Sequence, residues 1–117
     1  MAVPSVYTRD MARKLKEFYR EGQVIVNVSK GIEESSLKTL DVQIKEEIPG
    51  AVVTVLSGPS HAEEVARKLP TTCVVGVETI EVAKHIQNIF MSPVFRVYTS
   101  PDIIGIEIGA ALKNVIA

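Results

Sequence analysis

The side chains best placed to do chemistry are Lys113 and Asn114, near the end of the apolar stretch 102–117. Helical side chains lean toward the N-terminus, so Lys113 would lie over two small residues, Gly109 and Ala110. Small residues beneath a lysine leave room for a ligand or for a closely packed helix. Burial would favour the uncharged amine, and an amine poised near neutrality can act as a general acid or base. A lysine that only packs at a helix end fits the same pattern, and the residues alone leave both interpretations open.

Further candidates lie in turns that follow apolar strands. Lys30, beside Gly31, could hold a phosphate, a carboxylate or a carbonyl oxygen, and a nearby Lys30 would further favour an uncharged Lys113. A solvated loop lysine is the alternative. Gly58 and Ser60 stand between a strand and a helix, where free N–H groups and the helix dipole favour anions. Ser60 also stands three residues before a glutamate, which is typical of a structural capping box.

The elements that must position these residues alternate along the chain. Short apolar runs predict strands at 24–28, 51–56, 71–77 and 94–99. Helical periodicity predicts helices at 6–20, from Ser35 or Ser36 to 48, at 61–68, from Thr79 onward, and at 102–117. This alternation predicts a layered α/β architecture with a largely parallel sheet, which binds ligands beyond the carboxyl ends of its strands. The last helix is apolar over most of its circumference, so we expect it to be buried nearly all round.

The composition excludes several classes of partner. The chain has 117 residues and a formal net charge of -1, which gives no electrostatic case for nucleic acid or an anionic membrane. No apolar run approaches the ~20 residues that span a bilayer, and the first residues lack the features of a signal peptide. The single cysteine, Cys73, fits a reducing cytoplasm and a place in the core. His61 and His85 lack metal-ligand spacing, so we expect no metal site.

Four segments stand out when taken together: SKG at 29–31, LSGPS at 56–60, FRVYTS at 95–100 and GIEIGAALKNVIA at 105–117. In this order and spacing they closely resemble the bacterial type of NAD(P)-dependent glycerol-3-phosphate dehydrogenase, over nearly the whole chain. Each segment alone is a weak signal, whereas the combination is specific. The resemblance implies an oxidoreductase that interconverts sn-glycerol 3-phosphate and dihydroxyacetone phosphate by hydride transfer with NAD or NADP, and so feeds glycerophospholipid synthesis.

The same resemblance implies roles for individual residues. Lys113 corresponds to the catalytic lysine that gives and takes the proton at the substrate oxygen. The residues implied on the substrate side are Lys30, Gly58, Ser60 and Asn114. The residues implied on the cofactor side are Lys30, Ala62 and, more weakly, Ser5.

The chain also departs from the family pattern. The family begins with a strand and a glycine-rich GxGxxG turn that holds the pyrophosphate, and no such motif occurs here. The family also continues past the last helix into a helical domain. We therefore expect a partial Rossmann-like, doubly wound fold. Residues 1–101 would form the second part of the dinucleotide-binding domain, and 102–117 the start of the helix that leads into a C-terminal substrate domain outside this chain.

Three questions stay open at this stage. The chain could be a non-catalytic α/β fragment, or it could belong to another hydroxy-acid dehydrogenase of the same clan, although the FRVYTS and SGPS segments speak against the latter. The residues do not decide between NAD and NADP. They allow a homodimer, because a helix designed for burial would favour self-association where it is left uncovered.

Overall fold

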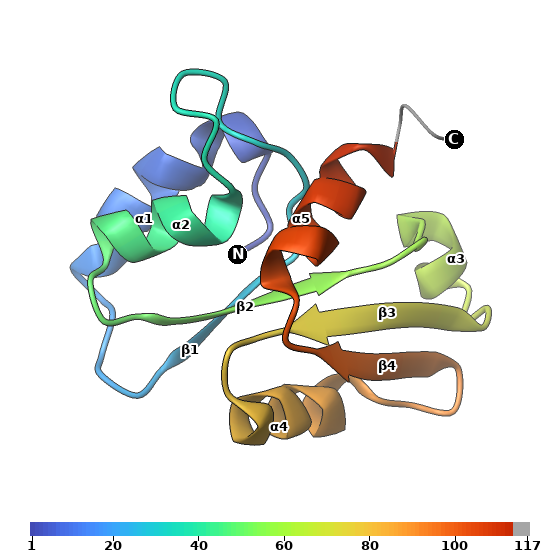
Figure 1. The fold of residues 1–117 in the computed structure, drawn as a ribbon. Coiled ribbons are helices and arrows are strands. Elements are labelled where there is room, and N and C mark those ends of the chain that lie inside the picture. The colour runs from blue at the N-terminus through green and yellow to red at the C-terminus, as the bar shows by residue number, and fades with distance from the viewer. Residues whose placement is uncertain (114–117) are drawn as a thin grey trace.

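Four strands form one sheet in the computed structural model, which describes residues 1–113. The strands follow chain order across the sheet (Figure 1). They are β1 (Val24–Asn27), β2 (Val52–Ser57), β3 (Thr71–Gly76) and β4 (Phe95–Ser100). All four coincide within a residue or so with the apolar runs of the sequence, and the predicted α/β class with a mostly parallel sheet is confirmed.

The central pair of strands runs antiparallel. β1 pairs β2 in parallel and β3 pairs β4 in parallel, but β2 and β3 run in opposite directions, with Val55 opposite Gly76. The element between them, α3 (Ala62–Ala66), has five residues and no buried side chain, so it does not cross a face of the sheet as a parallel connection requires. The start of β3 consequently lies beside the end of β2.

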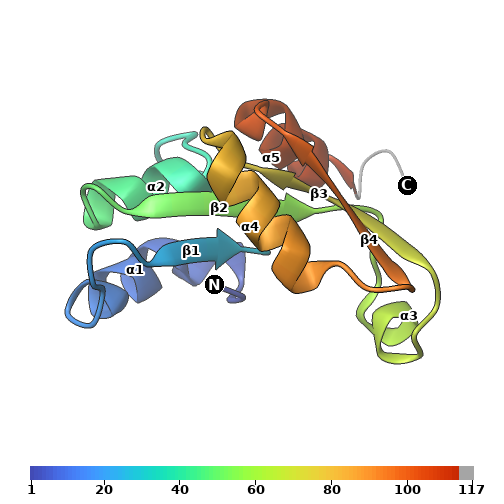
Figure 2. The same ribbon diagram turned by 90° about the horizontal axis from the view of Figure 1, so that it is seen from below.

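Helices cover both faces of the sheet, as in a doubly wound fold (Figures 1 and 2). On one face lie α1 (Thr8–Lys16), α2 (Leu40–Glu47) and α5 (Ile103–Ala111), and on the other lies α4 (Ile80–Phe90). A short 3-10 turn, η1 (Ser5–Tyr7), precedes α1. Each face has its own apolar cluster: Ala12, Ile44 and Val53 belong to the first, and Val75, Ile86 and Val97 to the second.

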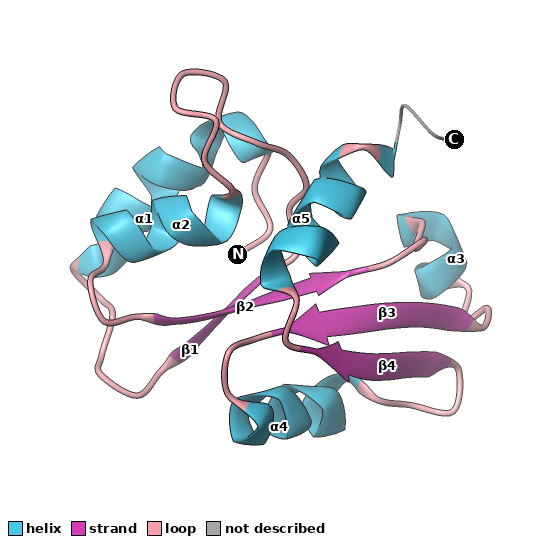
Figure 3. Cartoon of the chain, in the orientation of Figure 1, coloured by secondary structure: helices cyan, strands magenta, loops and turns pink. Residues whose placement is uncertain are grey.

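Two of the predicted helix starts are wrong. The N-cap of α2 is Thr39, while the hydroxyls of Ser35 and Ser36 donate hydrogen bonds to a glutamate within the preceding loop. The N-cap of α3 is His61, and its side chain makes no capping bond, so Ser60 does not form the expected capping box. In both places the helix begins later than the local pattern indicated, and Figure 3 shows the loops that precede α2 and α3.

The last helix packs on the sheet along one face and exposes another. Asp102 caps it, since its carboxylate accepts the N–H of Gly105 at 2.9 Å. Ile103 is buried, but Ile104 and Ile108 are 63% and 41% exposed. The expectation that α5 is buried nearly all round is therefore wrong for residues 103–113, because the described chain covers only the side that faces β2 and β3.

The first residue continues the hydrogen bonding of the sheet beyond β1. The Met1 amino group donates to the carbonyl of Val26, and the Met1 carbonyl accepts the N–H of Val28 at 3.0 Å. Two bonds from one residue to alternate residues of its neighbour are the pattern of a parallel pair. Burial lowers the pKa of the Met1 amino group. Met1 thus forms one rung of a parallel ladder with β1.

Candidate functional site

A cavity of about 420 Å³ lies between α5 and the place where β2 ends beside β3. Its lining consists of Ser57, Gly58, Pro59, Val74, Gly105, Ile106, Gly109, Ala110 and Lys113. Its size is within the range of small-molecule sites, and its position at the carboxyl end of β2 is the one expected for a ligand in such a sheet. The structure thus brings Gly58 and Lys113, which are far apart in sequence, to one cavity.

Lys113 lines the cavity together with Gly109 and Ala110, the two small residues that precede it on α5. A Cβ added to Gly109 would meet no atom within 4 Å, so neighbouring atoms do not require a glycine there. Gly58 differs, because a Cβ there would overlap the carbonyl of Thr72 on β3. Gly58 is therefore needed for the close approach of β2 and β3, whether or not a ligand also approaches it.

The positive charges of Lys30 and Lys113 both act on the buried thiol of Cys73. Burial raises the pKa of the Cys73 thiol, while its hydrogen bond with Ser60 and the positive charges of Lys30 and Lys113 act in the opposite direction. Lys30 does not line the cavity, but it is near enough to act on the same thiol as Lys113.

The turn after β1 lies against the start of the chain. A Cβ on Gly31 would come within 2.7 Å of the Ser5 hydroxyl oxygen, so Ser5 and the Lys30–Gly31 turn are direct neighbours. Ser29 fastens the same turn by donating its hydroxyl hydrogen bond to the carbonyl of Val3. The segment around Ser5 and the Lys30–Gly31 turn thus meet at the carboxyl end of β1.

The remaining candidates lie at the rim. The Ser60 N–H donates to the carbonyl of Gly58 at 2.8 Å, which tightens the turn after β2. Ala62 is the first residue of α3 and is exposed, and neither Ser60 nor Ala62 lines the cavity. Asn114 lies outside the described residues.

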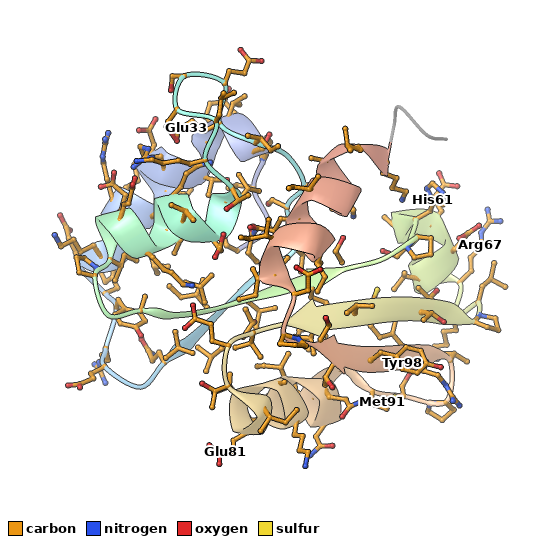
Figure 4. The ribbon with its side chains drawn as sticks, in the orientation of Figure 1. Glu33, His61, Arg67, Glu81, Met91 and Tyr98 are labelled. Atoms are coloured by element: carbon orange, nitrogen blue, oxygen red, sulfur yellow. The ribbon has the colours of Figure 1, made fainter. Side chains whose placement is uncertain are left out.

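His61 and His85 are both exposed, and Figure 4 shows His61 beside α3 at the edge of the molecule. Within residues 1–113, no group of three or more His, Cys, Asp or Glu side chains could hold a metal ion. None of the helices described is long and apolar enough to cross a bilayer.

The sequence interpretation missed a buried carboxyl pair beside the site. Glu107 of α5 is 3% exposed and accepts the backbone N–H of Asp41, at the start of α2, at 3.0 Å. A single acidic residue in an otherwise apolar helix was the available signal. Its partner lies 66 residues away in the sequence, so no local pattern could name it.

A mostly parallel sheet with helices on both faces and a cavity at a strand end is a Rossmann-like arrangement. The family described as "NAD-dependent glycerol-3-phosphate dehydrogenase N-terminus" matches residues 1–83, and the chain belongs to this family. The resemblance inferred from the four sequence segments is thereby confirmed.

Individual relatives and solved structures agree with this assignment. The chain is 57% identical over 117 residues to a glycerol-3-phosphate dehydrogenase [NAD(P)+] of Agathobacter rectalis and 56% identical over 119 residues to that of Fusobacterium nucleatum. The crystal structure of glycerol-3-phosphate dehydrogenase from Coxiella burnetii matches 98% of the chain with a TM-score of 0.91 at 29% identity. The glycerol-3-phosphate dehydrogenase structure from Saccharomyces cerevisiae matches 97% with a TM-score of 0.85 at 26% identity.

The chain spans about a third of these proteins. All of its residues align with the Agathobacter and Fusobacterium relatives, but they cover 35% and 36% of those sequences. They likewise cover 35% of the Coxiella chain and 35% of the yeast chain.

Proposed function

We propose that this chain is part of an oxidoreductase that interconverts sn-glycerol 3-phosphate and dihydroxyacetone phosphate with NAD or NADP. The observation that carries the proposal is that Lys113 and two small residues, Gly109 and Ala110, line one cavity with the turn after β2. The names of the relatives supply the substrate and the cofactor.

In this proposal Lys113 is the acid and base. When glycerol 3-phosphate is oxidised, its amine accepts the proton of the hydroxyl that becomes the carbonyl, and in the reverse direction it returns that proton to the carbonyl oxygen. Lys30 adds a second positive charge, which attracts the anionic substrate. Gly58, Ser60 and Asn114 complete the substrate side.

The residues present fit the nicotinamide part of a dinucleotide better than its pyrophosphate. The cavity lining is mainly apolar, which suits a flat ring, and the chain has no glycine-rich turn for phosphates. When bound, the cofactor supplies the acceptor and donor of the hydride. Lys30, Ala62 and Ser5 would contact it, and Ser5 and Lys30 belong to turns that touch each other.

The proposal also assigns the parts of the chain. Residues 1–101 would be the second part of the dinucleotide-binding domain, and 102–117 the start of the helix that leads into a substrate domain. The apolar, partly exposed surface of α5 supports this division, because a helix of this composition needs a second partner besides the sheet.

A chimera tests the proposed reaction. The 117 residues replace the aligned part of the Agathobacter rectalis relative, and oxidation of NADH or NADPH is followed with dihydroxyacetone phosphate. Lys113→Ala should lower kcat by about 10²- to 10⁴-fold, the usual contribution of a general acid, while cofactor binding persists. Lys84→Ala, at an exposed lysine on α4, is the matched control.

Full activity of the Lys113→Ala chimera would show that this lysine is not the acid and base. Turnover of other hydroxy acids in preference to glycerol 3-phosphate would reject the proposed substrate. Absence of any turnover by a folded, cofactor-binding chimera would favour a non-catalytic role for the chain.

A further inference from the structure

α5 meets the start of α2 where the carboxyl group of Glu107 bonds the backbone of Asp41. Glu107 is the only acidic residue in α5, and one of its oxygens, Oε1, accepts the Asp41 N–H at 3.0 Å. Asp41 is the second residue of α2 and is itself only 6% exposed. Glu107 therefore places its carboxyl on the first turn of α2, where a free N–H group is available.

The surroundings of Asp41 favour a negative charge on that residue. Its carboxylate accepts the Thr39 hydroxyl at 2.6 Å and the Lys45 ammonium at 3.3 Å. Lys45 also reaches Glu78, at 3.1 Å, and so joins the pair to the turn before α4. Burial acts to raise the pKa of Asp41, but hydrogen bonds from Glu107 and Thr39 and the charge of Lys45 outweigh it and lower that pKa.

The surroundings of Glu107 favour a proton on that residue. Its second oxygen, Oε2, is buried and accepts no hydrogen bond from the part of the chain described. An ionised oxygen in this position would be costly, whereas a protonated one can donate to the adjacent Asp41 carboxylate. Burial, followed by the hydrogen bond and the charge of Asp41, raises the pKa of Glu107 to about 8.

We propose that Glu107 and Asp41 share one proton, and that this pair fixes α5 on the start of α2 and thereby positions Lys113 over its cavity. Lys113 follows Glu107 by six residues, or about 9 Å along a helix, so a shift of α5 at Glu107 is carried directly to the amine. Glu107 acts in this way as a positioning residue and not as a catalytic one. The positioning of Lys113 rests on the proposed function, whereas the shared proton does not.

Carboxyl titration tests the shared proton without substrate. In the 117-residue chain with ¹³C-labelled glutamate and aspartate, the side-chain carbon of Glu107 is assigned by comparison with Glu107→Gln and followed by NMR as the pH rises. We expect Glu107 to titrate several pH units above the exposed glutamates, and to titrate lower after Asp41→Asn. Titration of Glu107 together with the exposed glutamates would overturn the proposal.

The chimera described above tests the positioning role. Glu107→Gln retains a donor for Asp41 and an acceptor for its N–H, so kcat at pH 7 should stay within about threefold of the parent. Glu107→Ala should lower kcat about 10- to 100-fold, with little change in the KM for the cofactor, because it misplaces Lys113 without removing a ligand contact. Glu63→Gln, on exposed α3, is the matched control.

The pH profile separates this role from a merely structural one. The parent chimera should lose kcat as the pH rises through the titration of Glu107, because two adjacent carboxylates repel each other, and Glu107→Gln should not show this loss. An equal loss of kcat in Glu107→Gln and Glu107→Ala would overturn the positioning role. An inactive parent chimera would reject the proposed function and the positioning of Lys113 together, whereas a high titration of Glu107 would still support the shared proton.

Discussion

Gly109 lines the cavity at a position where no neighbouring atom requires a glycine. Gly58 is required by packing, because a Cβ there would overlap the backbone of β3. Gly109 faces open space at the cavity and lies in a helix, where glycine is unfavourable. We infer that Gly109 keeps room for the ligand beneath Lys113.

Gly109→Leu tests this inference. Leucine favours a helix over glycine by about 0.5–1 kcal/mol, so the variant should be at least as stable as the parent in chemical denaturation. Its side chain would fill the cavity, so the chimera should bind substrate much more weakly. Gly58→Ala should be less stable than the parent, because its methyl group would overlap the backbone of β3. Unchanged turnover in Gly109→Leu would show that the cavity is not the site.

At the scale of single residues, the sequence foretold contacts within one helix or turn. Helical spacing predicted that Lys113, Gly109 and Ala110 share one face of the last helix, and all three line the same cavity. The sequence did not predict the hydrogen bond between Glu107 and Asp41, because that bond depends on how α5 is placed relative to α2. Such a register is set by the packing of the whole face and leaves no local trace.

Among the elements, α1 and α2 are joined by two arginines of α1, Arg9 and Arg13, and Arg9 makes most of the bonds. Arg9 bonds Glu33 at 2.9 Å, Glu46 at 3.0 Å and Glu47 at 2.9 Å, which links α1 to α2 and to the loop before it. Figure 4 shows Glu33 in that loop. The pKa of Glu33 and of Glu47 is lowered first by Arg9, and that of Glu46 first by Lys38 and then by Arg9.

These lowered pKa values give a signed pH dependence. Their stabilisation is fully present above the ordinary glutamate pKa of 4.5 and is lost as the pH falls through the lower folded-state values. Arg9→Met should therefore be less stable than the parent at pH 7, and the difference should shrink in acid and in high salt. Urea unfolding from pH 7 to 3 measures this, with exposed Arg67→Met as the control. A difference that does not change with pH would refute the linkage.

At the element scale, apolar runs located every strand, but the direction of β3 escaped the sequence. The composition of an apolar run such as TTCVVG does not indicate the direction of its strand in the sheet. The segment before it had a helical pattern, but α3 has only five residues. Helix starts were also less predictable than helix bodies. Several serines and threonines stand near each helix start and could act as the N-cap, and in the structure Thr39 is the N-cap of α2.

For the whole molecule, one side of α5 is an apolar surface that the described residues leave exposed. Ile104, Ile108 and Leu112 follow each other at helical spacing and are 63%, 41% and 45% exposed. We expect the 117-residue chain to self-associate through this stripe as its concentration rises. Sedimentation velocity of the double variant Ile104→Lys with Ile108→Lys should show mainly monomer.

Leu37→Lys is the control for this prediction, since Leu37 is 78% exposed but stands alone in a loop. It should associate like the parent. If the double variant associates equally well, the stripe is not the contact surface, and the partner of α5 must be sought elsewhere.

The half-buried end of the chain has a practical consequence for laboratory work. The Met1 amino group carries a charge that burial disfavours, and one of its N–H groups donates a hydrogen bond to the Val26 carbonyl. An N-terminal tag, or acetylation, turns this ammonium into an amide, which keeps one N–H for Val26 and has no charge to desolvate. Extension before Met1 should therefore be tolerated where it runs alongside β1, whereas deletion of Met1 would remove the rung that shields the outer edge of that strand.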